Sequence, residues 1–460
     1  MTFSDYIDYL RGKRIGVIGF GVSNQPLVRV LLRNGCDVTV CDRRERAQLG
    51  AAGDEAAAQG AKFALGADYL EHLDFDVIFR TPGVLPIVPQ LRKAAQNGAI
   101  LTSEMEAFCN LCPCRILAIT GSDGKTTTST ITAELLRAQG YTVHLGGNIG
   151  TPLFDRIADI RPDDFAVLEL SSFQLHSMHC APDVAIITNI SPNHLDVHPD
   201  LEDYVSAKCS IYRGQRPDGV LVLNARDAHT PRFAAEAPGS VRYFSSIGPV
   251  ENGVYCSDGV IYRAHGGKAE KLIDVSDIRI PGAHNVENYM AAFAATDGLV
   301  GQAVCVQVAR SFAGVPHRME RIRELNGITF INDSIASSPT RTIAGLHALP
   351  KPPVIILGGH DKHIPFDELG DEICLHAKAA VVVGETAQRI AAAIRGSKFY
   401  DPGKLPLVEA QDFRAAVETA YRLAQPGDTV TLSPACSSFD FFKNFAERGD
   451  TFRAIVESLQ

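Results

Sequence analysis

A segment in which one lysine and three threonines follow two glycines lies at residues 116–128, ILAITGSDGKTTT. Its two glycines allow the backbone to turn so that amide groups face phosphate oxygens, and Lys125 can neutralise the charge of a terminal phosphate. The hydroxyl of Thr126 is a typical ligand of Mg²⁺ in such a loop. The general Walker A loop would need glycine at Ile119, so this segment is a shorter variant. We predict that it binds a nucleoside triphosphate through consecutive residues, which are Gly121, Ser122, Asp123, Gly124, Lys125, Thr126, Thr127 and Thr128.

Two later segments carry ionisable groups where predicted strands end: ELSSFQ at 169–174 and NISPNHLD at 189–196. Ligands of open α/β sheets bind at the carboxyl ends of strands, so these groups should lie near the phosphate loop. Glu169 is then a candidate ligand of Mg²⁺, which prefers hard oxygen ligands. His194 could ligate a cation, orient a ligand or have a structural role.

A second glycine loop, GFGVSN at 19–24, follows a predicted strand and precedes a predicted helix. Backbone amides in such a position can hold a diphosphate. Asp42 ends the next strand about 20 residues further on, as the ribose-binding acid of a dinucleotide fold would. However, Asn24 stands where that fingerprint has its third glycine, and Arg43 and Arg44 suit a ligand with phosphate or carbonyl groups. A nicotinamide-dependent oxidoreductase remains an alternative at this point.

Apolar, β-branched runs alternate with amphipathic stretches almost throughout, which is typical of parallel, doubly wound α/β sheets. The clearest predicted strands are 14–20, 37–42, 115–120, 165–170, 184–189, 353–359 and 429–435. Breaks near Ser103 and near 314–316 divide the chain into three α/β domains, at 1–103, 104–315 and 316–460. Between about 240 and 280, the alternating runs VRYFSS and GVYCSDGVIYRA predict a small antiparallel insertion in the middle domain.

Charge and composition exclude some classes of partner. The net charge of −9 argues against nucleic acid and against an anionic membrane surface, since both favour basic proteins. The first residues, MTFSDYIDYLRGKR, lack the basic and apolar regions of a secretory signal, and no apolar run suits a membrane span, so we expect a cytoplasmic protein. The 11 cysteines fit reduced thiols. We assign no metal to Cys109, Cys112 and Cys114, because a fourth zinc ligand is not evident nearby.

A set of short segments, which follow one another along nearly the whole chain, resembles the Mur ligase family. They are GFGVSN (19–24), TGSDGKTTT (120–128), GGNIGTPL (146–153), ELSSFQL (169–175), NISPNHLDVH (189–198), YVSAKCSIY (204–212), PGAHNVENYMAA (281–292), GVPHRME (314–320), NDSIASSPT (332–340) and SPACSSFDFFKNFAERG (433–449). The resemblance implies three domains: a Rossmann-like N-terminal domain for a UDP-linked substrate, a central P-loop ATPase domain, and a Rossmann-like C-terminal domain for an amino acid. It further implies a monomeric enzyme that joins D-glutamate to UDP-N-acetylmuramoyl-L-alanine in peptidoglycan precursor synthesis, using ATP and an acyl-phosphate intermediate.

The resemblance also implies roles for individual residues. The catalytic residues would be Lys125, His194 and Lys208. Two Mg²⁺ ions would be bound by Thr126, Glu169, His194 and Lys208, the last as a carbamylated lysine. Beyond the phosphate loop, ATP would be contacted by Asn285, Asn288, His317, Arg318 and Asp333. The UDP substrate would be held by Val22, Ser23, Asp42, Arg43, Gly83, Asn148 and His194. D-Glutamate would be held by Ser337, Lys362, Ser438, Phe439 and Phe445.

Some positions depart from the family's pattern and leave the amino-acid contacts open. Ile335 stands where a lysine can occur, Ser337 where a threonine can occur, and Phe439 replaces a leucine. Asn193 stands where other branches have aspartate before the histidine, so it is not assigned as a base.

Several alternatives can be weighed against D-glutamate ligation. The DNPR-type motif of a ligase for diamino acids is absent, and a folate-modifying relative would lack a role for residues 1–103. A ligase for another amino acid, above all L-alanine, is the nearest alternative. A nucleotide-dependent regulator without catalysis is a more distant one.

Overall fold

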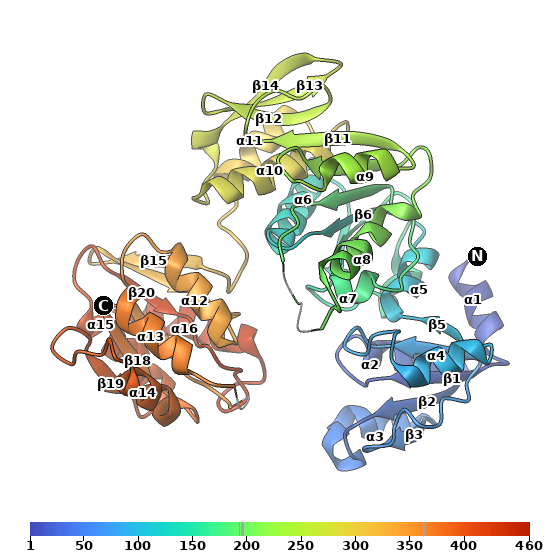
Figure 1. Cartoon of the computed structure of the whole chain (residues 1–460), viewed down its shortest axis with the longest axis horizontal. Helices are drawn as coiled ribbons and strands as arrows, with labels where there is room; N and C mark the ends of the chain where they lie inside the picture. Colours follow the sequence, from blue (N-terminus) through green and yellow to red (C-terminus); the bar gives the residue numbers. More distant parts are fainter. Residues whose placement is uncertain (193, 195–196, 362–363) are drawn as a thin grey trace. The chain divides into compact units, whose positions relative to one another are not determined.

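The computed structural model describes residues 1–192, 194, 197–361 and 364–460. The chain divides into two compact units, Met1–Phe312 and Ala313–Gln460. The strands form three sheets, two in the first unit and one in the second (Figure 1). In the part of the chain that is described, no helix is both long enough and apolar enough to cross a membrane.

The first sheet is parallel, in the order β3–β2–β1–β4–β5. Its central strands are buried on both faces, as parallel strands covered by helices must be. One face packs on α1, α2 and α3, and the other packs on α4. The bounds are α1 Phe3–Leu10, β1 Arg14–Ile18, α2 Asn24–Arg33, β2 Asp37–Asp42, η1 Arg46–Leu49, α3 Gly50–Ala58, β3 Lys62–Leu65, β4 Val77–Arg80, α4 Pro89–Gln96 and β5 Ile100–Thr102.

The second sheet has the order β14–β13–β12–β11–β10–β9–β6–β8–β7. Helices α6, α10 and α11 cover one face, and α5, α7, α8 and α9 cover the other. The apolar core on this second face is continuous with the core of the first sheet, so the two sheets form one compact unit. The bounds are α5 Glu104–Leu111, β6 Arg115–Thr120, α6 Lys125–Gln139, β7 Val143–Gly147, η2 Phe154–Asp159, β8 Phe165–Glu169, α7 Ser172–Leu175, β9 Val184–Ile187, α8 Leu201–Arg213, β10 Val220–Asn224, α9 Thr230–Glu236, β11 Ser240–Ser245, β12 Gly253–Ser257, β13 Val260–His265, β14 Lys268–Asp274, η3 Val275–Asp277, α10 Ala283–Ala295 and α11 Gln302–Ser311.

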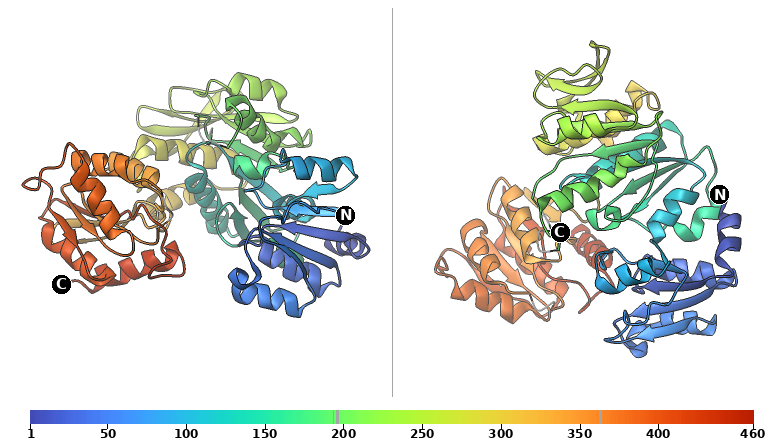
Figure 2. Two further views of the ribbon diagram at one scale, coloured as in Figure 1. Left: turned by 60° about the horizontal axis from the view of Figure 1, so that its bottom comes forward. Right: turned by 45° about the vertical axis from the view of Figure 1, so that its right-hand side comes forward.

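The insertion expected between about 240 and 280 is smaller than the sequence pattern indicated. Strands β12, β13 and β14 are antiparallel to one another, as predicted. Strand β11, which carries the run VRYFSS, instead pairs parallel with both β10 and β12. Its assignment to the antiparallel insertion was therefore wrong, because alternating residues give the same pattern in a parallel strand near a sheet edge. Figure 2 shows the antiparallel strands at the end of the second sheet in two further views.

The third sheet has the order β15–β16–β20–β17–β18–β19, with β15 antiparallel to β16 and the remaining pairs parallel. Helices α12, α13 and α14 cover one face, and α15 and α16 cover the other. The bounds are β15 Glu320–Leu325, β16 Ile328–Asn332, α12 Pro339–Ala348, β17 Val354–Leu357, α13 Asp367–His376, β18 Ala379–Val382, α14 Ala387–Gly396, β19 Leu407–Glu409, α15 Phe413–Leu423, β20 Thr429–Leu432 and α16 Phe445–Ser458.

The predicted fold class is confirmed, because three mainly parallel α/β sheets follow one another along the chain. The strands predicted from apolar runs are all present, within a few residues of their expected ends. The division into domains at 1–103, 104–315 and 316–460 stays a prediction, since the compact units number two.

Candidate functional site

The phosphate loop connects β6 to α6 and depends on two glycines. Gly121 has φ +146° and Gly124 has φ +77°, both outside the range that residues with a side chain favour. A Cβ atom on Gly121 would lie 1.9 Å from Thr188 Oγ1, and one on Gly124 would lie 2.3 Å from Asn288 Oδ1. The loop therefore has neither the backbone freedom nor the space for larger residues.

Two lysines donate hydrogen bonds to the carbonyl oxygens of this loop. Lys125 Nζ lies 2.9 Å from Gly121 O and 2.8 Å from Ser122 O. Lys208, on α8, is 1% exposed, and its Nζ lies 2.7 Å from Gly121 O. Burial, and then the neighbouring charge of Lys125, lowers the pKa of Lys208 well below its usual value. The structure thus brings both predicted catalytic lysines to the same carbonyl group.

Glu169 ends β8 beside this loop. It is 1% exposed, and its Oε1 accepts a hydrogen bond of 2.8 Å from Asn148 Nδ2. Its Oε2 is buried and accepts no hydrogen bond from a residue that the structure describes. A buried carboxylate oxygen without a donor has a desolvation cost that a bound cation would remove. The residues present therefore fit the predicted Mg²⁺ site, to which Thr126, the second residue of α6, would also contribute.

Residues at the end of β9 hold the phosphate loop from the other side. Asp123 N donates to Asn189 Oδ1 at 3.0 Å, and Thr188 Oγ1 donates to Asp123 O at 2.6 Å. The hydroxyl of Ser122 lies 2.9 Å from that of Tyr204 on α8. Sequence reasoning had assigned no role to Thr188 or Tyr204, although Tyr204 begins the segment YVSAKCSIY that resembles the family.

His194 lies beside a stack of aromatic rings, with φ +56°. The ring centroids of His194 and Phe173 are 5.0 Å apart, and Phe173 stacks on His198 at 5.3 Å. His198 is held on both sides, by Asp203 Oδ2 at 2.6 Å from its Nδ1 and by Ser172 Oγ at 2.9 Å from its Nε2. Asn193 lies outside the described residues.

Helix α10 brings a row of amide side chains to the phosphate loop. Asn288 is 6% exposed, and its Oδ1 accepts a hydrogen bond of 3.2 Å from Thr128 Oγ1. Its Nδ2 donates to Asn285 Oδ1 at 3.2 Å, and Asn285 Nδ2 donates to Pro281 O at 2.6 Å. The two asparagines predicted to contact adenine are thus aligned with each other and with the loop.

At the first glycine loop, by contrast, the protein's own polar groups form hydrogen bonds with one another. Asp42 Oδ2 accepts a hydrogen bond of 2.7 Å from Phe20 N, and both Asp42 oxygens pair with the guanidinium of Arg44. Burial alone would raise the pKa of Asp42, but hydrogen bonds from Arg44 and from the amide of Phe20 lower it to about 2. Buried Asn24 donates to Gly19 O at 2.8 Å, a role that a third glycine could not have.

The other residues predicted to bind a UDP group lie around this loop on the surface. Val22 is 76% exposed, and Arg43 and Gly83 are also exposed. Ser23 caps α2 without a side-chain hydrogen bond to the helix. Asn148 does not belong to this set in space, since its side chain contacts Glu169 of the second sheet.

Arg80, at the end of β4, joins the first sheet to the second. Its side chain is 1% exposed, and it donates to Ser177 Oγ at 2.7 Å and to Phe173 O at 3.1 Å. Burial lowers the pKa of Arg80 to about 10. No motif indicated this residue, because its partners are mainly backbone carbonyls that the sequence does not distinguish.

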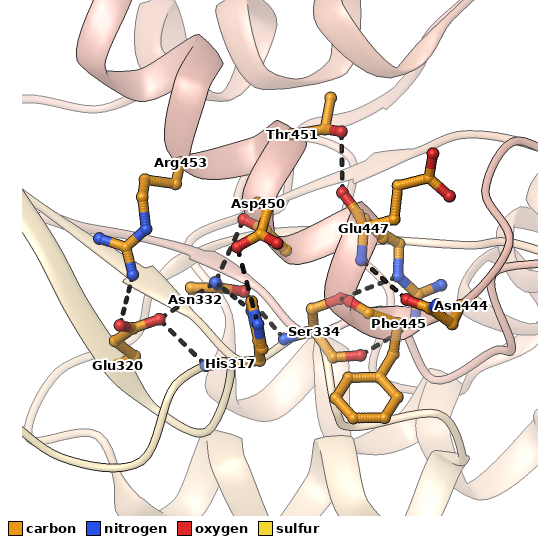
Figure 3. Close-up of polar contacts among 12 residues, drawn as sticks. His317, Glu320, Asn332, Ser334, Asn444, Phe445, Glu447, Asp450, Thr451 and Arg453 are labelled. Carbon is orange, nitrogen blue, oxygen red and sulfur yellow. Dashed lines mark hydrogen bonds and ion pairs between the residues drawn. The ribbon is translucent and has the colours of Figure 1, made fainter. Parts of the chain in front are cut away.

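The second unit holds His317 and Asp333 at adjacent strand ends. Asn332 Nδ2 donates to His317 Nδ1 at 3.1 Å, and His317 N donates to Glu320 Oε2 at 3.0 Å (Figure 3). Glu320 also pairs with Arg453 of α16. A Cβ atom on Gly449 would lie 2.2 Å from His317 Nδ1, so this glycine leaves space for the ring.

Asp333 is 4% exposed and accepts a hydrogen bond of 2.8 Å from Ser433 Oγ. Burial raises the pKa of Asp333 to about 6, against the effect of that hydrogen bond. Arg318 is exposed.

The residues predicted to hold an amino acid differ in their exposure. Ser438 is buried, whereas Phe439 is 66% exposed and Phe445 is 39% exposed. Ser337 lies two residues before α12, and Lys362 lies outside the described residues.

Arg448 connects two segments: 332–340, which carries Ser337, and 433–449, which carries Ser438, Phe439 and Phe445. It is 2% exposed and donates to Ser334 O at 2.9 Å and to Ser437 O at 3.0 Å. Like Arg80, it is a buried arginine that sequence reasoning missed.

Known proteins share both halves of this arrangement. Residues 119–296 match the Mur ligase middle domain, and residues 317–436 match the Mur ligase, glutamate ligase domain. A protein of Acetivibrio thermocellus named UDP-N-acetylmuramoylalanine--D-glutamate ligase is 46% identical over 461 aligned positions, which cover 99% of each chain. The chain belongs to the Mur ligase family.

Other Mur ligases agree with this assignment. A Clostridium kluyveri protein of the same name is 43% identical over 100% of this chain and 99% of its own. Among solved structures, MurF from Acinetobacter baumannii has a TM-score of 0.56 at 19% identity and covers 96% of this chain and 90% of its own. The alanine ligase MurC from Thermotoga maritima has a TM-score of 0.54 at 18% identity and covers 97% and 99%. At such identities the solved Mur ligases support the fold alone.

Membership of the Mur ligase family settles one alternative left open by the sequence. The glycine loop at 19–24 is not the fingerprint of a nicotinamide-dependent oxidoreductase, because the whole chain aligns with ligases. The internal pairing of Asp42 with Arg44 gives the physical reason for the false likeness, since the acid already has its partners.

Proposed function

We propose that this Mur ligase joins D-glutamate to UDP-N-acetylmuramoyl-L-alanine in peptidoglycan precursor synthesis. The observation that supports this most strongly is the full-length similarity to proteins named for that reaction, at 43–46% identity. The phosphate loop, the buried lysine and the buried carboxylate suit an enzyme that activates a carboxylate with ATP. A ligase for L-alanine is disfavoured, since the relatives at this level of identity are named for D-glutamate.

The enzyme uses ATP and Mg²⁺, as Mur ligases do. The loop amides and Lys125 would hold the terminal phosphates, and Asn285 and Asn288 would hold the adenine end. His317, Arg318 and Asp333 of the second unit are proposed as further ATP contacts. Bound Mg²⁺ would neutralise phosphate charge during phosphoryl transfer.

We propose further that two ions are bound and that Lys208 is carbamylated. Carbon dioxide reacts with an unprotonated amine, and burial of Lys208 favours that form. The resulting carbamate would be an anion near Glu169, whose Oε2 accepts no described hydrogen bond. Thr126 and His194 would complete the set of metal ligands.

The chemistry that follows has two steps. The substrate carboxylate attacks the γ-phosphorus of ATP, ADP leaves, and an acyl phosphate forms. The amine of D-glutamate then attacks the acyl carbon, phosphate leaves, and the amine gives up a proton. Lys125 would stabilise negative charge in both steps, which need positioning and charge neutralisation more than a protein nucleophile.

Substrate contacts are proposed on both sides of this chemistry. Val22, Ser23, Asp42, Arg43 and Gly83 would contact the UDP group. Asn148 and His194 would contact the muramoyl part. Ser337, Lys362, Ser438, Phe439 and Phe445 would contact D-glutamate, as proposed from the sequence alone.

We also propose that the enzyme acts in the cytoplasm as a monomer. All 11 cysteines are free thiols, which suits a reducing compartment. Sedimentation equilibrium of the full chain would measure the oligomeric state.

The function is tested by phosphate release from Mg-ATP in the presence of UDP-N-acetylmuramoyl-L-alanine. D-Glutamate, L-glutamate, L-alanine and L-lysine are compared with no amino acid, and the product is weighed by mass spectrometry. Release that depends on D-glutamate, with a product heavier by one glutamyl residue, is expected. Release with L-alanine alone would overturn the proposed amino acid, and no release with any of them would overturn the proposed activity.

A further inference from the structure

Two histidines and a glutamate come together on the surface of the second unit, and none of the three is assigned to ligation. His347 lies in the last turn of α12, and Glu372 and His376 lie one turn apart near the end of α13. His347 Nε2 is 2.6 Å and His376 Nε2 is 3.4 Å from Glu372 Oε2. The rings of His347 and His376 meet edge to face, with centroids 4.7 Å apart. Figure 1 shows α12 and α13 side by side, and the two helices pack on each other.

The ligand atoms of this cluster have the spacing of a metal site. All three lie within 4.8 Å of one another. Two ligands bound tetrahedrally to one zinc ion lie about 3.3 Å apart. The distance from His376 to Glu372 already has this value, and the contact of His347 with Glu372 would lengthen by less than about 1 Å.

The position on the helices also favours a cation. Both histidines lie in the last turns of their helices, where the partial negative charge of the terminal carbonyls attracts positive charge. The side chains are 49%, 24% and 47% exposed for His347, Glu372 and His376, so water can reach the remaining coordination positions. Imidazole nitrogen with one carboxylate oxygen is a ligand set for Zn²⁺, Ni²⁺ or Cu²⁺ and not for Mg²⁺.

We propose that His347, Glu372 and His376 bind one transition-metal ion of the zinc class, in a site separate from the ligase reaction. The ion ties the ends of α12 and α13 together. It touches none of the residues assigned to ATP, UDP or D-glutamate, so its effect is on the stability of the helix pair and not on turnover. Without a metal, the same cluster consists of one hydrogen bond between His347 and Glu372 and a longer contact between His376 and the same carboxylate oxygen.

Equilibrium dialysis against ZnCl₂ tests the proposal on the full chain, in excess MgCl₂ so that the Mg²⁺ sites are filled. The test protein is the double variant Glu372→Gln, His376→Gln. The matched control is His265→Gln, because His265 is 62% exposed and pairs with Asp297 but belongs to neither ligand group found among the described residues. Zinc bound by thiols or by His198 and its neighbours is the same in all three proteins.

The wild type and the control should each bind one zinc ion more than the double variant, or bind it at least about 10-fold more tightly. Equal stoichiometry and affinity in all three proteins would overturn the site. Thermal unfolding provides a second measurement, since Zn²⁺ should raise the Tm of the wild type and not that of the double variant.

Two further controls keep the test decisive. Without zinc, the Tm of the double variant should equal that of the wild type. If its Tm is lower, the variant His347→Gln, on the other helix, is used in its place. A wild-type Tm that does not respond to Zn²⁺ at saturating concentration would count against the clamp between α12 and α13.

Discussion

The loops at 19–24 and 121–124 both follow a parallel strand and lead into a helix, but their surroundings differ. In the first loop, Asp42 and Arg44 form hydrogen bonds with the main chain of Phe20 and with each other. In the second loop, Lys125 and Lys208 both donate to Gly121 O, while nearby Glu169 retains a buried oxygen with no described donor. The polar groups of the first loop pair with one another, whereas the second loop lies beside a buried carboxylate whose Oε2 accepts no described hydrogen bond.

This difference separates two ways of using one backbone arrangement. Charge that the protein compensates stabilises the fold and fixes a surface for binding. Charge that is buried without compensation costs folding free energy and is retained where a ligand will use it. The two loops should therefore respond to mutation and to pH in opposite ways.

Replacing Lys125 with alanine should have the largest effect on activity. We expect kcat to fall at least about 10²- to 10³-fold, as for other preorganised groups that stabilise transferring charge. Phosphate release at saturating substrate concentrations measures kcat. Lys268→Ala, at an exposed position of β14, is the matched control. Retention of more than about a tenth of the wild-type kcat would show that the second loop does not depend on this charge.

Replacing Lys208 with methionine should separate activity from stability. Ligation should slow, though by less than in Lys125→Ala, yet the free energy of unfolding at pH 7 should increase, because the buried amine has a pKa below its unfolded value. Above the lowered pKa of the folded state, the unfolded chain holds a proton that the folded chain lacks, so wild-type stability rises with pH there, up to about 10.4. The advantage of methionine should shrink by up to about 1.4 kcal/mol per pH unit.

Urea unfolding between pH 7 and 9, in buffer free of carbon dioxide, measures that difference for Lys208. A methionine variant less stable than the wild type at pH 7 would mean that the lysine contributes to folding, as Asp42 does in the first loop.

Alanine at the loop glycines should distinguish the two loops by stability. Gly121→Ala places Cβ against Thr188 at a backbone angle unsuited to alanine, and we expect a loss of at least about 2 kcal/mol. Gly21→Ala meets no heavy atom within 4 Å, so a change within about 0.5 kcal/mol is expected. Equal losses in chemical unfolding would contradict the view that Gly121 is sterically constrained and Gly21 is not.

Replacing Asp42 with asparagine should lower the free energy of unfolding by about 2 kcal/mol at neutral pH. The pKa of Asp42 is lowered to about 2, so its contribution is fully present above about 4 and is lost as the pH falls through 2. The difference in unfolding free energy between wild type and variant should therefore close in acid. Asp37→Asn is the matched control, because Asp37 is 48% exposed in its pair with Lys62 and should contribute less. A difference that persists unchanged at pH 2 would rule out the charge as its source.

The sequence predicted those features whose cause is local. The apolar runs gave the strands, and the glycine spacing gave the phosphate loop, because one short segment contains the whole signal. The sequence did not predict the direction of β11, because apolar and polar residues alternate in the same way in parallel and antiparallel strands near a sheet edge.

Features that depend on distant groups were missed. Arg80 and Arg448 are buried against backbone carbonyls from other segments, which no residue type announces. Cys180 lies beside Cys109, and the hydrogen bond between them, together with burial, raises the pKa of the Cys109 thiol. The sequence had grouped Cys109 only with Cys112 and Cys114. The pairing of Asp42 with Arg44 is likewise visible only in the structure, and the predicted contact of Asp42 with the UDP substrate stays a prediction.

The buried arginine at the end of β4 limits how this ligase could be recombined with its relatives. A chimera that takes the first sheet from one protein and the second from another must match Arg80 to Ser177 and to the carbonyl of Phe173. A mismatch would leave either a desolvated guanidinium or unsatisfied carbonyls, at about 1–3 kcal/mol for each lost partner. A chimera should therefore take both sheets from the same protein. Substitutions meant to change specificity are better placed at the exposed residues around Val22 and Arg43.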